Sequence, residues 1–183
     1  MVLAASVCGA GKVGQMESVQ KAIRLTFFDQ RTARQVMFEH SATADAVMIV
    51  AAVNAIVLLV LHLRVGSFDL LAILEGTIRG LAGWLFLSFA IWLMGTKLLK
   101  GNGDPQTMIR TSGFASLPLL LGALTFVWGG LSWVGLLWHL ALLVLVAKVS
   151  LGLEWIEAAA AVALGAALIY LIQTLLGAAF FRF

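Results

Sequence analysis

Cysteine is almost absent from this 183-residue chain, and charged residues are scarce. The one cysteine, Cys8, excludes an intrachain disulfide and any metal site built from several cysteines. Charged residues make up 11% of the sequence and apolar residues 62%, and the mean hydropathy is +1.03. A soluble fold of this length cannot bury so much apolar surface, so lipid must cover the remainder. The composition therefore predicts an integral membrane protein.

The apolar segments also lack the residues that intramembrane enzymes use. None contains an aspartate, an HExxH zinc motif or a GxSxG nucleophile motif. The net charge is only +3, and the basic residues flank apolar segments instead of lining a groove, which argues against a nucleic-acid partner. We therefore expect a non-enzymatic protein with no cofactor.

The first 44 residues contain no apolar segment long enough to span a membrane. Residues 1–16 lack the basic start and the long apolar core of a signal peptide, and we expect a flexible tail there. Residues 17–44 place apolar side chains at helical spacing and charged ones on other faces, which predicts a pair of amphipathic helices in the membrane interface. Ser18 and Asp29 are the expected N-caps of these two helices.

Basic side chains gather in this segment and in the later polar connection that contains GNGDPQ. They are candidate contacts for anionic lipid or for a partner protein. Seven residues make up this set: Lys21, Arg24, Arg31, Arg34, Lys97, Lys100 and Arg110.

Residues 45–177 form the predicted membrane domain, and residues 178–183 a short C-terminal tail. The first of its five apolar segments is long enough, at ~1.5 Å per residue, to cross roughly 27 to 30 Å of hydrocarbon. The second could begin near Asp69 as an interfacial turn, and we expect it to tilt or to enter through the interface. The segments are 46–63, 80–96, 112–130, 131–149 and 156–176. The predicted fold is an all-α polytopic membrane protein: five transmembrane helices preceded by the amphipathic interfacial pair.

The distribution of basic residues predicts the orientation. With the N-terminus in the cytoplasm, nine of the twelve basic residues fall on that side, and only Arg64, Arg79 and Arg182 fall on the other. This excess predicts a cytoplasmic N-terminus and an outside C-terminus.

Pro118 lies inside the third apolar segment, in the stretch MIRTSGFASLPLLL. Because proline carries no backbone N–H, we expect it to bend this helix or to separate an interfacial turn from the span. Small residues four apart, such as Ala161 and Gly165, predict close helix packing, but this weak signal leaves homo-oligomerisation open.

A few polar residues within the apolar segments form the candidate intramembrane site. Asn54, His139 and Gln173 lie in the first, fourth and fifth segments. A neutral imidazole in lipid can relay protons, ligate a metal or hold the magnesium of a pigment. The alternative for His139 is a structural hydrogen bond to a backbone carbonyl or to water.

The order of these features resembles the bacterial branch of the Yip1 family. In that family a Gly-Phe/Tyr-Ala-Ser-Leu-Pro stretch opens the third span. Six consecutive residues match it here: Gly113, Phe114, Ala115, Ser116, Leu117 and Pro118. The resemblance extends over about residues 18–177 and implies a five-span, non-enzymatic protein of the bacterial inner membrane. Eukaryotic members are associated with vesicle traffic and small GTPases, but their DLYGP-type motif has no counterpart in this sequence, so that function is not transferred.

Three functions of different classes remain. The first is a scaffold, accessory or assembly subunit that contacts other membrane proteins or anionic lipids. The kink expected at Pro118 and the intramembrane polar residues motivate a small transporter or channel as the alternative. His139 motivates a second alternative, a cofactor-binding or pigment-binding subunit. We rank them in this order because five spans with almost no buried charge offer little chemistry.

Overall fold

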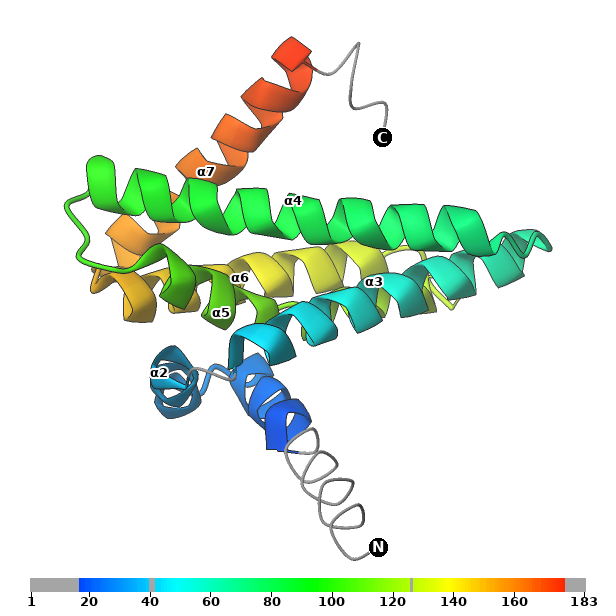
Figure 1. Ribbon diagram of the computed structural model, residues 1–183, viewed down its shortest axis with the longest axis horizontal. Helices are drawn as coiled ribbons and strands as arrows, with labels where there is room; N and C mark the ends of the chain where they lie inside the picture. Colours follow the sequence, from blue (N-terminus) through cyan, green and yellow to red (C-terminus); the bar gives the residue numbers. More distant parts are fainter. Residues whose placement is uncertain (1–16, 40–41, 126, 177–183) are drawn as a thin grey trace, which may run out of the picture.

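The computed structural model describes residues 17–39, 42–125 and 127–176, and this part of the chain is helical, without strands (Figure 1). A helix over residues 17–26 and α2 (Gln30–Phe38) form an N-terminal helix pair beside a bundle. The bundle consists of α3 (Ala42–Val65), α4 (Leu70–Lys97), α5 (Pro105–Phe114), the 3-10 helix η1 (Leu117–Leu124), α6 (Leu131–Leu151) and α7 (Trp155–Leu176). The tails expected at residues 1–16 and 178–183 lie outside the described residues.

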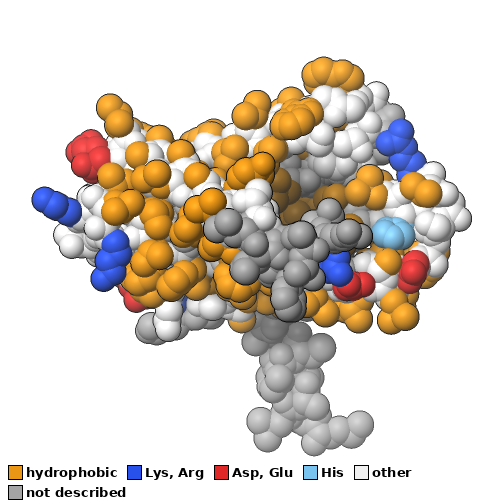
Figure 2. Space-filling view, turned by 90° about the horizontal axis from the view of Figure 1, so that it is seen from above, with side chains coloured by type: hydrophobic (Ala, Val, Ile, Leu, Met, Phe, Trp, Pro, Cys, Tyr) orange, Lys and Arg blue, Asp and Glu red, His pale blue; other side chains and the backbone are white. Residues whose placement is uncertain are grey.

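Five segments of the described chain are long and apolar enough to cross a membrane, and the predicted all-α polytopic membrane fold is confirmed. They are Ala42–Val65, Leu70–Lys97, Pro105–Leu124, Leu131–Leu151 and Trp155–Thr174. Large apolar side chains remain exposed over much of the bundle, and Figure 2 shows them spread across one face with few charged groups among them. Lipid is the solvent that such a surface requires.

The second span is longer than its uncharged part, because Asp69 begins the helix eleven residues before Gly80. The Asp69 carboxylate accepts hydrogen bonds from the backbone N–H groups of Leu71 and Ala72, at 3.0 and 3.1 Å. These bonds satisfy donors that the first helical turn leaves unpaired. Glu75 and Arg79, one turn apart on this helix, form an exposed ion pair. Because their opposite charges pair, the helix can extend beyond its uncharged part.

The third span changes helix type before Pro118, which confirms the interruption predicted from that proline. The α-helix α5 ends at Phe114, and the chain continues as η1. In an α-helix the carbonyl of Phe114 would accept from residue 118, but proline has no N–H to donate. The chain tightens instead, and the N–H of Leu119 donates to the carbonyl of Ser116 at 3.0 Å, three residues back.

The N-terminal helix pair confirms one expected cap and not the other. Asp29 is the N-cap of α2, where its carboxylate accepts from the Arg31 N–H at 2.9 Å and from the Thr32 hydroxyl at 2.7 Å. Ser18 was wrongly expected to cap the first helix, since residue 17 is already helical. The Ser18 hydroxyl donates instead to the Asp45 carboxylate at 2.7 Å, which ties the helix to the start of α3.

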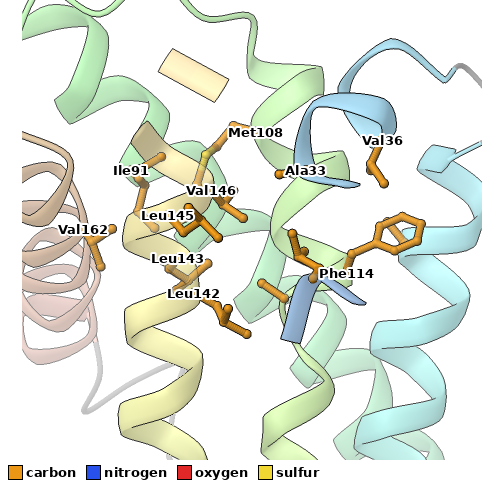
Figure 3. Close-up of a cluster of buried hydrophobic side chains, with 14 of the residues drawn as sticks. Ala33, Val36, Ile91, Met108, Phe114, Leu142, Leu143, Leu145, Val146 and Val162 are labelled. Atoms are coloured by element: carbon orange, nitrogen blue, oxygen red, sulfur yellow. The ribbon is translucent and has the colours of Figure 1, made fainter. Parts of the chain in front are cut away.

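A single cluster of buried side chains joins the N-terminal helix pair to the bundle. Figure 3 shows Val36 of α2 and Phe114 of α5 on one side of it, with Leu142 of α6 and Val162 of α7 further across. α4 packs along α3 and α7, whereas α6 packs against η1 and α7. In Figure 1 α7 runs obliquely to α4 and leaves the bundle toward its C-terminal end.

Candidate functional site

A chain of hydrogen-bonded polar side chains connects α4 and α5 inside the bundle. The indole N–H of Trp84 donates to the hydroxyl of Ser112 at 2.9 Å, and the hydroxyls of Ser88 and Ser112 are 2.7 Å apart. Because each hydroxyl has one proton, one serine donates to the other, and the second donates to a carbonyl of its own helix: Ile109 at 2.9 Å from Ser112, or Trp84 at 2.8 Å from Ser88. All three side chains are buried, so in lipid these bonds hold the two helices together.

His139 of α6 reaches the point where the third span changes helix type. Its Nδ1 lies 2.8 Å from the carbonyl oxygen of Ala115. In a regular α-helix that carbonyl would accept from Leu119, but the Leu119 N–H is used within η1. The carbonyl that Pro118 indirectly frees is therefore satisfied by an imidazole from the neighbouring helix. This is the structural hydrogen bond that the sequence left as an alternative for His139.

Behind this contact lies a cavity of about 150 Å³, which brings two of the three candidate intramembrane residues together. Asn54 and His139 both line it, from α3 and α6. Gln173 is exposed near the end of α7, where the helix has left the bundle, and does not line this cavity. The lining residues are Val50, Asn54, Gly80, Gly83, Trp84, Leu87, Ser88, Ser116, Leu119, His139 and Leu143.

The volume of the cavity and the side chains around it can be compared with what a pigment-binding site would need. A cavity of about 150 Å³ is far smaller than a pigment macrocycle, and His139 is its one imidazole. Within the described residues no three His, Cys, Asp or Glu side chains gather as a metal site would require. The cavity suits a small molecule held by hydrogen bonds.

Two of the seven candidate basic residues hold the fold together. The Arg110 side chain is only 5% exposed, and its guanidinium donates to the carbonyl of Met37 at 2.8 Å and to the Thr43 hydroxyl at 3.0 Å. Lys21 lies 2.8 Å from the Glu39 carboxylate and 3.0 Å from that of Glu17. The hydrogen bond to Glu39 is the main reason that the pKa of Lys21 is raised above its ordinary value.

The other five basic residues are exposed and have no ion-pair partner within the part of the chain that the structure describes. They are Arg24, Arg31, Arg34, Lys97 and Lys100. Arg31 and Arg34 are three residues apart on α2 and share a face. These side chains are free to meet negatively charged groups outside the protein.

The helix over residues 17–26 presents an apolar face next to its polar one. Val19, Ile23 and Phe27 are 51%, 48% and 73% exposed, whereas Ala22 and Leu25 are fully buried. The exposed face opens onto an apolar groove of about 470 Å³, walled on the other side by η1 and Trp138. The indole N–H of Trp138 donates to the carbonyl of Thr26 at 3.0 Å and fixes the end of this helix to α6.

The six residues of the Gly-Phe-Ala-Ser-Leu-Pro stretch lie at the centre of the packing. A Cβ at Gly113 would stand 2.6 Å from the Cβ of Ala46 and 3.0 Å from the Trp84 ring, so glycine lets α5 approach α3. Ala115 supplies the carbonyl for His139, and Pro118 breaks the α-helix. Phe114 and Ser116 are buried, and Leu117 is half-buried.

Trp84 and Ser112 were not recognised from the sequence as members of a polar network. Tryptophan in a membrane protein usually indicates the lipid interface, and a single serine in an apolar helix carries little information. The available signal was the density of hydroxyls in MIRTSGFAS, where Thr111, Ser112 and Ser116 fall within six residues. The structure pairs Thr111 with Ser150 of α6 at 2.9 Å, and Ser112 with Ser88 of α4 at 2.7 Å.

Comparison with known proteins supports the resemblance seen in the sequence. The model of one family, described as the Yip1 domain, matches residues 23–177. That range contains α2, all five candidate spans and the residues that line the cavity. Searches of curated proteins and of solved structures each found no match.

Proposed function

Since this chain belongs to the Yip1 family of membrane proteins, we propose that it is a non-enzymatic accessory protein of the bacterial inner membrane that binds anionic lipid through its N-terminal helix pair. The observation that carries this proposal is the combination of free arginines with an exposed apolar face on one docked element. Arg24, Arg31 and Arg34 supply the positive charge, and Val19 and Ile23 the apolar surface. An interfacial helix binds anionic membranes through electrostatic attraction and burial of apolar surface together.

The N-terminal helix pair is attached to the bundle by several contacts. This supports a role that depends on where the pair lies relative to the spans. Arg110 holds the end of α2 and the start of α3, Trp138 holds the end of the first helix, and Ser18 is bonded to Asp45. These contacts come from α3, α5 and α6, so the pair is fixed by three different spans. A fixed pair presents its arginines in a set geometry, which lowers the entropic cost of binding.

The proposed orientation places this pair in the cytoplasm. Lys97, at the end of α4, and Lys100, in the α4–α5 connection, fall on the same side as the N-terminal arginines when the spans are counted from the N-terminus. That connection is bonded to the end of α6, where the N–H of Asn102 donates to the carbonyl of Leu151 at 3.0 Å. The side with the excess of basic residues is expected to face the cytoplasm.

The test uses the full chain in nanodiscs that contain equal amounts of phosphatidylcholine and phosphatidylglycerol. Native mass spectrometry of the protein released from them counts the lipids that remain bound. We expect phosphatidylglycerol to be retained several-fold more than phosphatidylcholine. The triple variant Arg24→Gln/Arg31→Gln/Arg34→Gln should lose that preference, and added salt should weaken it in the unchanged protein.

Arg64→Gln is the control for a loss of charge, because Arg64 is an exposed arginine at the far end of α3. It should keep the preference for phosphatidylglycerol. Equal retention of the two lipids by the unchanged protein would contradict the proposal. A co-purifying membrane protein that the triple variant loses, with lipid retention unchanged, would favour a protein partner as the ligand of the same surface.

A further inference from the structure

The cavity beside His139 contains hydrogen-bond acceptors that no protein donor satisfies. The Ala115 carbonyl can only accept, so the 2.8 Å contact requires that Nδ1 of His139 carries the proton. In the neutral ring Nε2 then presents a lone pair. It has no hydrogen-bond partner among the described residues, although His139 is only 8% exposed.

This lone pair is not sealed inside the protein. Within the described ranges, every fully enclosed side-chain nitrogen or oxygen has a hydrogen-bond partner. Nε2 has none, so its surface must be open to a neighbouring space, and His139 is one of the residues that line the cavity. The imidazole therefore turns Nδ1 to the Ala115 carbonyl, just before η1, and Nε2 to the cavity.

Asn54 provides a second acceptor by the same reasoning. Its amide donates to the carbonyl of Val50 at 2.8 Å, which identifies that atom as Nδ2 and leaves Oδ1 as the free end. Oδ1 lies against Gly80 of α4, where a Cβ would overlap it. Glycine at this position makes room for the amide between the helices.

The serines on the cavity wall do not donate hydrogen bonds to Nε2 of His139 or to Oδ1 of Asn54. The one proton of the Ser88 hydroxyl is used toward the Trp84 carbonyl or toward Ser112, and the Ser116 hydroxyl points to the carbonyl of Ser112 at 3.5 Å. Each retains lone pairs after these bonds. The wall thus offers two unpaired acceptors, Nε2 and Oδ1, besides hydroxyl lone pairs.

We propose that this cavity is a binding site for small uncharged hydrogen-bond donors, bound between Nε2 of His139 and Oδ1 of Asn54 and occupied by water when no other donor is present. No lining residue is charged, so a cation would be buried without a counter-charge. A volume of about 150 Å³ is enough to hold several waters. Methanol and urea are of suitable size and are uncharged donors.

Gly83 marks a place where the site can be closed without disturbing the fold. It lines the cavity, it is exposed, and no atom lies within 4 Å of the position that its Cβ would take. A valine there adds bulk to the cavity or its mouth and touches none of the hydrogen bonds described above. Gly129 also has open space around its Cβ position and lies outside the cavity, so Gly129→Val is the matched control.

The experiment is solid-state NMR of the full chain in lipid bilayers, with ¹⁵N-labelled histidine. His40→Gln and His62→Gln are introduced throughout, so that His139 gives the imidazole signals. We expect Nδ1 to be protonated and Nε2 to be unprotonated, with a correlation between Nε2 and water protons. Methanol or urea, each titrated below denaturing concentration, should shift the Nε2 resonance with saturation.

Gly83→Val should remove the water correlation and reduce the saturating shift at least tenfold, whereas Gly129→Val should leave both unchanged. Absence of a water correlation in the unchanged protein would overturn the proposal, because the acceptors would then face a dry space. A protonated Nε2 would overturn it as well. A shift that rises linearly with methanol and with urea, or that persists in Gly83→Val, would show a solvent effect and exclude a binding site for these donors.

Discussion

His139 of α6 donates a hydrogen bond from Nδ1 to the carbonyl oxygen of Ala115, three residues before Pro118. The bond joins two spans just after the α-helical part of the third span ends. An unpaired carbonyl in lipid costs free energy comparable to a lost hydrogen bond. The proline and the histidine are therefore energetically coupled, although they are 21 residues apart in the sequence.

Replacing His139 with leucine should destabilise the protein by about 1–3 kcal/mol, because it leaves the Ala115 carbonyl without a donor. Reversible unfolding in mixed micelles with increasing SDS measures this cost. His139→Gln, whose amide can donate, should recover part of the loss. An unchanged unfolding midpoint for His139→Leu would show that the carbonyl finds another partner.

Pro118→Ala should reduce the importance of His139. The new N–H at residue 118 can bond to the carbonyl of Phe114, which allows the α-helix to continue and to use the Ala115 carbonyl itself. In a double-mutant cycle, His139→Leu should cost about 1 kcal/mol less in the alanine background. Additive effects of the two substitutions would contradict the coupling.

Gly113→Ala should destabilise the bundle by about 1–3 kcal/mol, because the added methyl would meet Ala46 and the Trp84 ring at 2.6 and 3.0 Å. Gly83→Ala is the matched control, since it adds the same group to a helix at a position with open space. It should be neutral or stabilising through helix propensity. SDS unfolding of the two variants distinguishes a packing requirement at Gly113 from a general effect of removing glycine.

Arg110→Met should release the N-terminal helix pair from the bundle. The arginine holds the Met37 carbonyl and the Thr43 hydroxyl, and bonds to a charged donor contribute about 1.5–3 kcal/mol. Hydrogen exchange read by mass spectrometry should become faster over residues 30–38 and remain slow in α6. Arg110→Lys should rescue little, because one ammonium cannot reproduce the two-pronged contact. Unchanged hydrogen exchange in Arg110→Met would mean that the contacts of Trp138 and Ser18 are sufficient to hold the helix pair on the bundle.

The cap of α2 should depend on pH through Asp29. The hydrogen bond from Thr32, followed by that from the Arg31 N–H, holds the pKa of this carboxyl below its ordinary value of 3.8. Because the pKa is lowered in the folded state, the cap stabilises α2 above that value and is lost as the pH falls through the folded pKa. An NMR titration of the Asp29 carboxyl carbon should give a midpoint below 3.8. Asp29→Asn should keep the helix and remove the pH dependence of its N-terminal turn.

The sequence by itself determined the class of protein and the number of candidate spans, because apolar composition and segment length depend only on the order of residues. The interruption of the third span and the cap at Asp29 were also predictable, since proline and N-cap chemistry act within a few residues. A start of the second span near Asp69 was predicted only as an interfacial turn, whereas the structure has one continuous helix from Leu70 to Lys97. Its start depends on the carboxylate of Asp69, and the ion pair of Glu75 with Arg79 lies within the helix.

Only the tertiary structure decided which polar residues meet. Asn54 and His139 line one cavity, and Gln173 does not, because α7 diverges from the bundle before it reaches that residue. Arg110, which resembled the other basic residues in sequence, is buried because two acceptors from another part of the chain lie within its reach. Such contacts depend on how helices rotate and cross, and these are set by close approaches such as Gly113 on Ala46, which local sequence patterns do not specify.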